Sequence, residues 1–143
     1  MYQGPNQWLQ KLRLDKLLDL SKDAANGPQV LLRVQAKTAD YTVLAQDSGT
    51  IFVTYGDTGA IVFTLPAVPT KGLFFLFFQS TDQNITINSA AANGIITFND
   101  LDADGVAATT SSGKIGALFL VFADGNIWNA ACLSVGTTMT VTT

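Results

Sequence analysis

The chain has 143 residues, of which 48% are hydrophobic and only 13% are charged, and its formal net charge is −3. This length suits one domain with an extension, and a charged fraction about half the usual ~25% predicts that a neighbouring subunit covers some apolar surface. The absence of His excludes the common Ser–His and Cys–His nucleophiles, and the single Cys excludes an intrachain disulfide and a cysteine-rich zinc site. We therefore expect a protein that is not an enzyme and holds no cofactor.

Basic residues are concentrated at the beginning of the chain. Six of the eight Lys and Arg residues lie within residues 1–37 beside three Asp residues, so this segment carries a formal charge of about +3. Residues 38–143 contain two Lys and eight Asp residues and carry about −6. This asymmetry predicts a cationic arm, residues 1–37, that docks onto a partner, joined to an anionic body at residues 38–143.

One helix is predicted, at residues 7–25, because Asn6 is a suitable N-cap and Gly27 and Pro28 end the helical pattern. Its apolar residues span a wide arc, which favours contact with another polypeptide, although a helix packed over its own domain is the alternative. We expect this segment to dock onto an acidic protein surface, where its aromatic and Leu side chains would be buried and its Lys and Arg side chains would set the orientation. The predicted capsid-binding residues are Tyr2, Trp8, Leu9, Lys11, Leu12, Arg13, Lys16 and Leu17.

After residue 28 the hydrophobic period changes to two, which predicts strands. Turn-forming sequences at 46–49 and 56–59 separate the first strands, and residues 124–126 predict a hairpin turn. Residues 101–113 are interpreted as a small-residue loop or a frayed strand. The spacing predicts an all-β fold: an antiparallel β-sandwich, jelly roll or barrel. Strands are expected at residues 30–36, 41–45, 50–55, 60–65, 73–79, 84–88, 94–98, 115–123, 127–133 and 135–143.

Two segments, residues 73–78 and 115–122, carry more large apolar side chains than one inner sheet face needs. Three-fold packing of subunits would bury this surplus, although a dimer would do the same. Trp128 is interpreted as a core or subunit-interface residue rather than a platform for a sugar. The residues predicted to form a trimer interface are Phe75, Phe77, Leu118, Leu120 and Trp128.

The sharpest small motif is Asp100, Asp102 and Asp104 followed by Gly105, which matches the first half of a calcium loop. Ser111 stands where that loop needs a bidentate Glu, so a solvated acidic loop is the preferred interpretation and no metal is expected. Cys132 lies among small apolar residues and is expected to be buried.

Nucleic acid and membranes are not expected partners. The basic arm lacks interleaved aromatic residues and is interrupted by Asp, unlike a nucleic-acid-binding segment. Its mixed charge also weakens a membrane-surface interpretation, and the longest apolar run is too short to span a bilayer.

Five segments carry a resemblance to a known group of proteins. They are Ala39–Val43 (ADYTV), Asp47–Phe52 (DSGTIF), Gly59–Pro66 (GAIVFTLP), Gly72–Phe75 (GLFF) and Asp124–Trp128 (DGNIW). Residues 39–133 resemble the β-domains of structural proteins from tailed bacteriophages, both capsid decoration (cement) proteins and parts of tail fibres.

The resemblance implies a homotrimer on the outside of a virion, made in the host cytoplasm. A cement protein of this kind would place its N-terminal segment on the capsid and bridge neighbouring major capsid proteins. The alternative is a tail-fibre or receptor-binding module that contacts host surface glycans.

Overall fold

The structure, a computed structural model, describes residues 32–109, 114–134 and 139–143. The predicted helix at residues 7–25 and the eight predicted capsid-binding residues lie outside these ranges. The compact unit begins at Leu32. The extended end of the predicted arm therefore contributes the first strand of the body, and the body starts about six residues earlier than expected.

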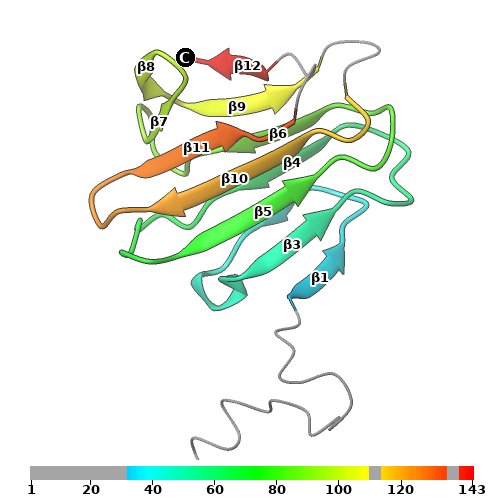
Figure 1. The fold of residues 1–143 in the computed structure, drawn as a ribbon, viewed down its shortest axis with the longest axis horizontal. Helices are drawn as coiled ribbons and strands as arrows, with labels where there is room; N and C mark the ends of the chain where they lie inside the picture. Colours follow the sequence, from blue (N-terminus) through cyan, green and yellow to red (C-terminus); the bar gives the residue numbers. More distant parts are fainter. Residues whose placement is uncertain (1–31, 110–113, 135–138) are drawn as a thin grey trace, which may run out of the picture. The chain divides into compact units, whose positions relative to one another are not determined.

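Strands dominate the described residues, and Figure 1 shows them in two layers. The strands are β1 (Arg33–Ala36), β2 (Tyr41–Thr42), β3 (Thr50–Val53), β4 (Ile61–Thr64), β5 (Phe74–Phe78), β6 (Ile85–Asn88), β7 (Ile95–Thr97), β8 (Asp100–Ala103), β9 (Gly105–Ala108), β10 (Leu118–Ala123), β11 (Trp128–Cys132) and β12 (Met139–Thr142). The all-β prediction is confirmed for this part of the chain, where the one helical element is the 3₁₀ turn η1 (Ala45–Asp47).

The chain alternates between the two layers through its first six strands. One sheet has seven strands in the order β1-β3-β5-β10-β11-β7-β8, and the other has five in the order β12-β9-β6-β4-β2. Because successive strands lie in different sheets, β1, β3 and β5 run parallel in one sheet, and β2, β4 and β6 run parallel in the other.

Both sheets are therefore mixed. Strands β7 and β11 also pair in parallel, so that five of the ten strand pairs among the described residues are parallel. The prediction of an antiparallel arrangement is wrong for these pairs. It is confirmed for the hairpin of β10 and β11, where Ala123 is the register partner of Trp128.

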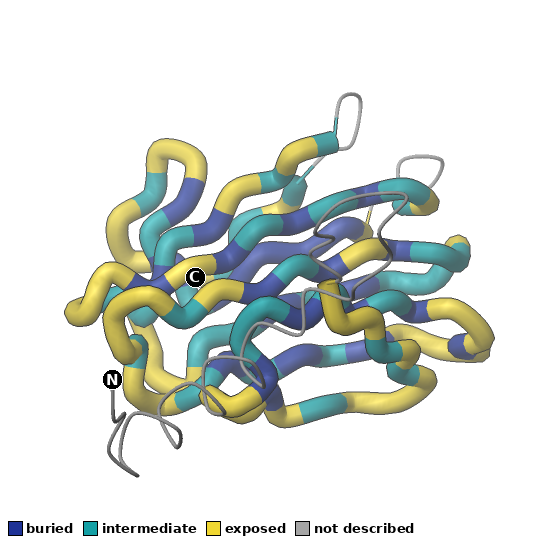
Figure 2. Tube along the Cα trace, turned by 60° about the horizontal axis from the view of Figure 1, so that its bottom comes forward, coloured by how far each residue is buried: buried dark blue, intermediate teal, exposed yellow. Residues whose placement is uncertain are grey.

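Aromatic side chains from both sheets fill the space between the layers. Phe52 of β3 and Phe77 of β5 lie with their ring centroids 5.6 and 4.9 Å from that of Phe63 on β4, in the opposite sheet. All three are fully buried. Trp128 is buried as well, and its indole N–H donates a hydrogen bond of 3.2 Å to the carbonyl oxygen of Pro66. Figure 2 shows the resulting alternation of buried and less buried positions along the strands.

The segment expected to be a loop or frayed strand, residues 101–113, instead contributes to both sheets through β8 and β9. Every residue of β9 is buried, which explains its small side chains. A Cβ atom on Gly105 would lie 2.7 Å from Oγ1 of Thr142 and 2.9 Å from the carbonyl oxygen of Ile87. The lack of large apolar residues in β9 reflects tight packing and not weak strand formation.

Candidate interaction surface

The outer side of the seven-stranded sheet is apolar across five neighbouring strands. Paired residues project from the same side of a sheet, so the register aligns Val34, Ile51, Leu76, Leu120 and Ala131 in one cross-strand row. We call the outward side chains of β1, β3, β5, β10 and β11 the apolar face. The apolar face comprises Val34, Ala36, Ile51, Val53, Phe74, Leu76, Phe78, Leu118, Leu120, Phe122, Asn129 and Ala131.

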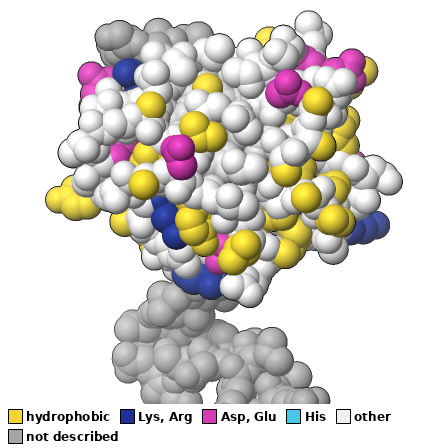
Figure 3. Space-filling view, turned by 180° about the vertical axis from the view of Figure 1, so that it is seen from behind, with side chains coloured by type: hydrophobic (Ala, Val, Ile, Leu, Met, Phe, Trp, Pro, Cys, Tyr) yellow, Lys and Arg dark blue, Asp and Glu magenta, His cyan; other side chains and the backbone are white. Residues whose placement is uncertain are grey.

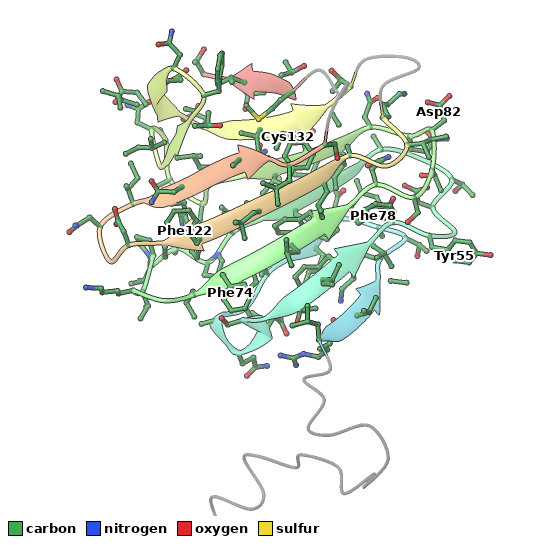
Figure 4. The ribbon with its side chains drawn as sticks, viewed as in Figure 1. Tyr55, Phe74, Phe78, Asp82, Phe122 and Cys132 are labelled. Carbon is green, nitrogen blue, oxygen red and sulfur yellow. The ribbon has the colours of Figure 1, made fainter. Side chains whose placement is uncertain are left out.

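Asn129 is the one polar side chain of the apolar face, and none of its twelve side chains is charged. Three phenylalanines stand out from it, with exposed fractions of 38% for Phe74, 37% for Phe78 and 43% for Phe122. Figure 4 shows Phe74 and Phe122 on the neighbouring strands β5 and β10, with Phe78 at the other end of β5. Large exposed apolar patches on soluble proteins mark interaction sites.

The outer side of the five-stranded sheet has a different composition. We call its outward side chains the threonine face, because five of the nine positions are Thr. The threonine face comprises Thr42, Val62, Thr64, Thr86, Asn88, Gly105, Ala107, Thr140 and Thr142. Figure 3 views the molecule from this side, where much of the surface is neither charged nor hydrophobic.

A polar groove of 420 Å³ lies beside the threonine face. Its polar lining comes from Thr86, Asn88, Ser89, Asp104 and Thr142, and three alanines from the loop before β7 complete it. Hydroxyl, amide and carboxylate groups of this kind can hydrogen-bond a polar ligand. None of the described residues that line the groove is an aromatic residue on which a sugar ring could stack.

Three residues predicted to form a trimer interface are core residues of the single chain. Phe75 and Phe77 are completely buried and Trp128 is 2% exposed, because all three project between the sheets. They cannot contact a second copy while the sandwich is folded, which corrects their assignment to an interface. The other two predicted residues, Leu118 and Leu120, project outward and belong to the apolar face.

Sequence reasoning missed Phe74, Phe78 and Phe122 as surface residues. In the apolar run of residues 73–78 every position is hydrophobic, so the period of two that separates inner from outer positions is hidden. The residue after the run misleads in the same way. Gln79 is polar but buried just after β5, so counting back by two from it as an outward residue would place Phe77 and Phe75 outside.

Two basic side chains on or beside the edge strand β1 make contacts within the chain. Arg33, on the edge strand β1, donates a hydrogen bond of 3.0 Å to the carbonyl oxygen of Gln46. The Nζ atom of Lys37 lies 3.3 Å from the centroid of the Tyr41 ring, in a cation–π contact. Burial raises the pKa of the Tyr41 phenol, and the hydrogen bond that this phenol donates to Asp47 acts in the same direction.

At the β10–β11 turn, Asp124 accepts backbone hydrogen bonds from Asn126 at 2.8 Å and Ile127 at 3.0 Å. These hydrogen bonds lower the pKa of the Asp124 carboxyl group. They explain why the sequence Asp124-Gly125-Asn126 forms a turn here, and they give this carboxylate a structural role.

The predicted acidic loop does not bring its carboxylates together as metal ligands. Asp100 and Asp102 lie on β8, where Oδ1 of Asp100 accepts a hydrogen bond from the Asp102 backbone N–H at 2.8 Å. Oδ1 of Asp104 accepts one from the backbone N–H of Asn93 at 2.6 Å. Within the described ranges, no three His, Cys, Asp or Glu side chains are close enough to hold a metal ion.

Cys132 is half-buried rather than fully buried, and it is a free thiol. It packs against the edge of the core and lines an apolar groove of 450 Å³ with Phe98, Ala130 and Met139 among its neighbours. Figure 4 shows it on β11, one of the strands that carry the apolar face.

The chain matches no known family model, and no curated protein matches it. Among the residues that the structure describes, no helix has the length and apolar character needed to cross a membrane.

Proposed function

We propose that this chain is a structural protein of a tailed-bacteriophage particle, and that it acts as a capsid decoration protein rather than as an enzyme. In this proposal the body forms a homotrimer on the outer capsid surface, and the N-terminal arm binds the major capsid protein. Binding assembled shells better than free capsid subunits stabilises the shell by mass action.

One observation carries the proposal: the body combines a closely packed core with an apolar face of twelve outward side chains. This composition is typical of a protein whose role is to assemble with other proteins. The resemblance of residues 39–133 to phage β-domains and the cationic, Leu-rich sequence of residues 1–37 support the virion setting and the docking role.

The alternative proposal is a tail-fibre or receptor-binding module that contacts host glycans. The polar groove beside the threonine face favours it, because its hydroxyl, amide and carboxylate groups match the hydrogen-bonding needs of a sugar. Two features weaken it. The groove lacks an aromatic platform, and the indole of Trp128 is buried with its N–H directed to Pro66.

The position of the chain on the particle separates the two proposals. We expect an antibody against the full-length protein, followed by a gold-labelled secondary antibody, to label heads of intact particles in electron micrographs. Labelling confined to tails would contradict the decoration role and favour the alternative.

The docking role of the arm is tested with full-length Lys16→Asp and the matched variant Lys71→Asp, which makes the same charge change in the body. We expect Lys16→Asp to weaken co-sedimentation with purified heads several-fold, with a smaller effect at high salt, because an attractive charge becomes a repulsive one. Lys71→Asp should bind like the wild type. If Lys16→Asp binds as well as Lys71→Asp, the arm does not orient the contact through this charge.

A further inference from the structure

We infer that the apolar face is covered by a second copy of this chain. The inference rests on the homotrimer of the proposed function. It assigns the contact between subunits to the apolar face, because Phe75, Phe77 and Trp128 are buried in the core. It does not depend on the capsid role.

The absence of charge on the apolar face permits contact with an identical partner. Residues 38–143 carry a formal charge of about −6, so a basic partner would be drawn to the acidic loops rather than to a face without charge. The apolar face offers a partner neither an ion pair nor, beyond Asn129, a hydrogen-bonding side chain. The surface that complements it must also be uncharged and apolar, and this chain supplies such a surface.

The composition of the face indicates a permanent contact. Interfaces between proteins that also exist apart are about as polar as the rest of the surface, whereas obligate interfaces resemble a domain core. The cross-strand row of the apolar face resembles an obligate interface, since all its members are apolar: Val34, Ile51, Leu76, Leu120 and Ala131. A partner that is always present when the chain is made is another copy of the chain.

The size of the face fits the centre of such an interface. From strand geometry, each outward side chain occupies roughly 33 Å² of sheet, so twelve positions cover on the order of 400 Å². A standard interface buries about 800 Å² on each partner, with an apolar centre and a polar rim. The apolar face therefore supplies about half of the required area, and the loops around it supply the rim.

The exposed phenylalanines provide the test. Phe122→Lys places a charge within the proposed contact, in the row of Phe74 and Asn129 at one end of the apolar face. It should not disturb the core, because the side chain projects outward and is 43% exposed. Tyr55→Lys is the matched control, since Tyr55 is 75% exposed and lies in the turn after β3, outside the twelve positions of the apolar face (Figure 4). Phe122→Thr is a milder variant that suits a strand and serves if Phe122→Lys does not fold.

We expect full-length wild-type protein to sediment as a trimer of its 15.2 kDa chain. Phe122→Lys should weaken association at least about tenfold while the far-ultraviolet circular dichroism stays unchanged, and Tyr55→Lys should sediment like the wild type. A wild-type protein that sediments as a single chain would overturn both the inference and the homotrimer. Trimers of unchanged stability in Phe122→Lys, or in Phe122→Thr, would overturn the inference alone and leave the homotrimer standing.

Discussion

The two outer faces of the sandwich share strand geometry but not chemistry. Thr on the outside of the five-stranded sheet satisfies the preference of strands for β-branched residues and still presents a hydroxyl group to water. Phe on the outside of the seven-stranded sheet also suits a strand, as an aromatic residue, but Phe and Leu there leave apolar surface in water. The five-stranded sheet shows that strands of this fold can carry polar outer side chains, so the apolar outer side of the seven-stranded sheet indicates an interaction site.

The contrast between inside and outside is sharpest on β5, where the same residue type occupies neighbouring positions. Phe75 is buried between the sheets, whereas Phe74 projects from the apolar face. We expect Phe75→Ala to lower the free energy of unfolding by about 3–5 kcal/mol, because it removes a packed ring and leaves a cavity. This loss should not depend on protein concentration.

Phe74→Ala is the matched variant. It should cost less than about 1.5 kcal/mol in the separated chain, because the ring is already partly in water. In the assembly its cost should grow with protein concentration, since the ring then contributes to association. Urea denaturation at several protein concentrations measures both variants, and equal, concentration-independent losses would contradict the assignment of inner and outer positions.

An effect smaller than that of Phe75→Ala is expected at Gly105 on the threonine face. Its missing side chain lets β9 lie close to Thr142 and to the backbone of Ile87. We expect Gly105→Ala to lower the free energy of unfolding by about 1–3 kcal/mol, because the added methyl group would be overpacked against backbone atoms.

Gly59→Ala is the control for this variant, since an added Cβ atom at Gly59 meets no atom within 4 Å. Thermal denaturation compares the two. If both variants melt at the wild-type temperature, close packing does not explain the small residues of β9.

Much of the fold could be predicted from the sequence. Alternation of polar and apolar residues located most strands to within a few residues, and Asp124-Gly125-Asn126 correctly predicted the β10–β11 hairpin. The pairing could not be predicted, because turn sequences such as residues 46–49 do not indicate whether the next strand lies beside the last or in the opposite sheet. The parallel pairs of β1, β3 and β5 depend on long-range packing.

The presence of an exposed apolar surface could be predicted from the sequence, but the residues that form it could not. The excess of large apolar residues in 73–78 and 115–122 correctly indicated more apolar surface than one core can bury. Uniformly apolar strands hide which side faces inward, so Phe75 and Phe77 were selected in place of Phe74 and Phe78. Strand β9 could not be predicted, because its small residues have a low strand propensity. The sequence does not show that the neighbouring strands lie close enough to require small side chains.

The most direct test of the central claim is hydroxyl-radical footprinting of the full-length wild-type protein at high and low concentration. Phe122 is 43% exposed in the single chain, and Tyr55, at 75%, is an internal reference outside the apolar face. The account predicts that Phe122 is protected at high concentration and becomes labelled on dilution, while labelling of Tyr55 stays constant. Labelling of Phe122 that matches its single-chain exposure at every concentration would contradict the account.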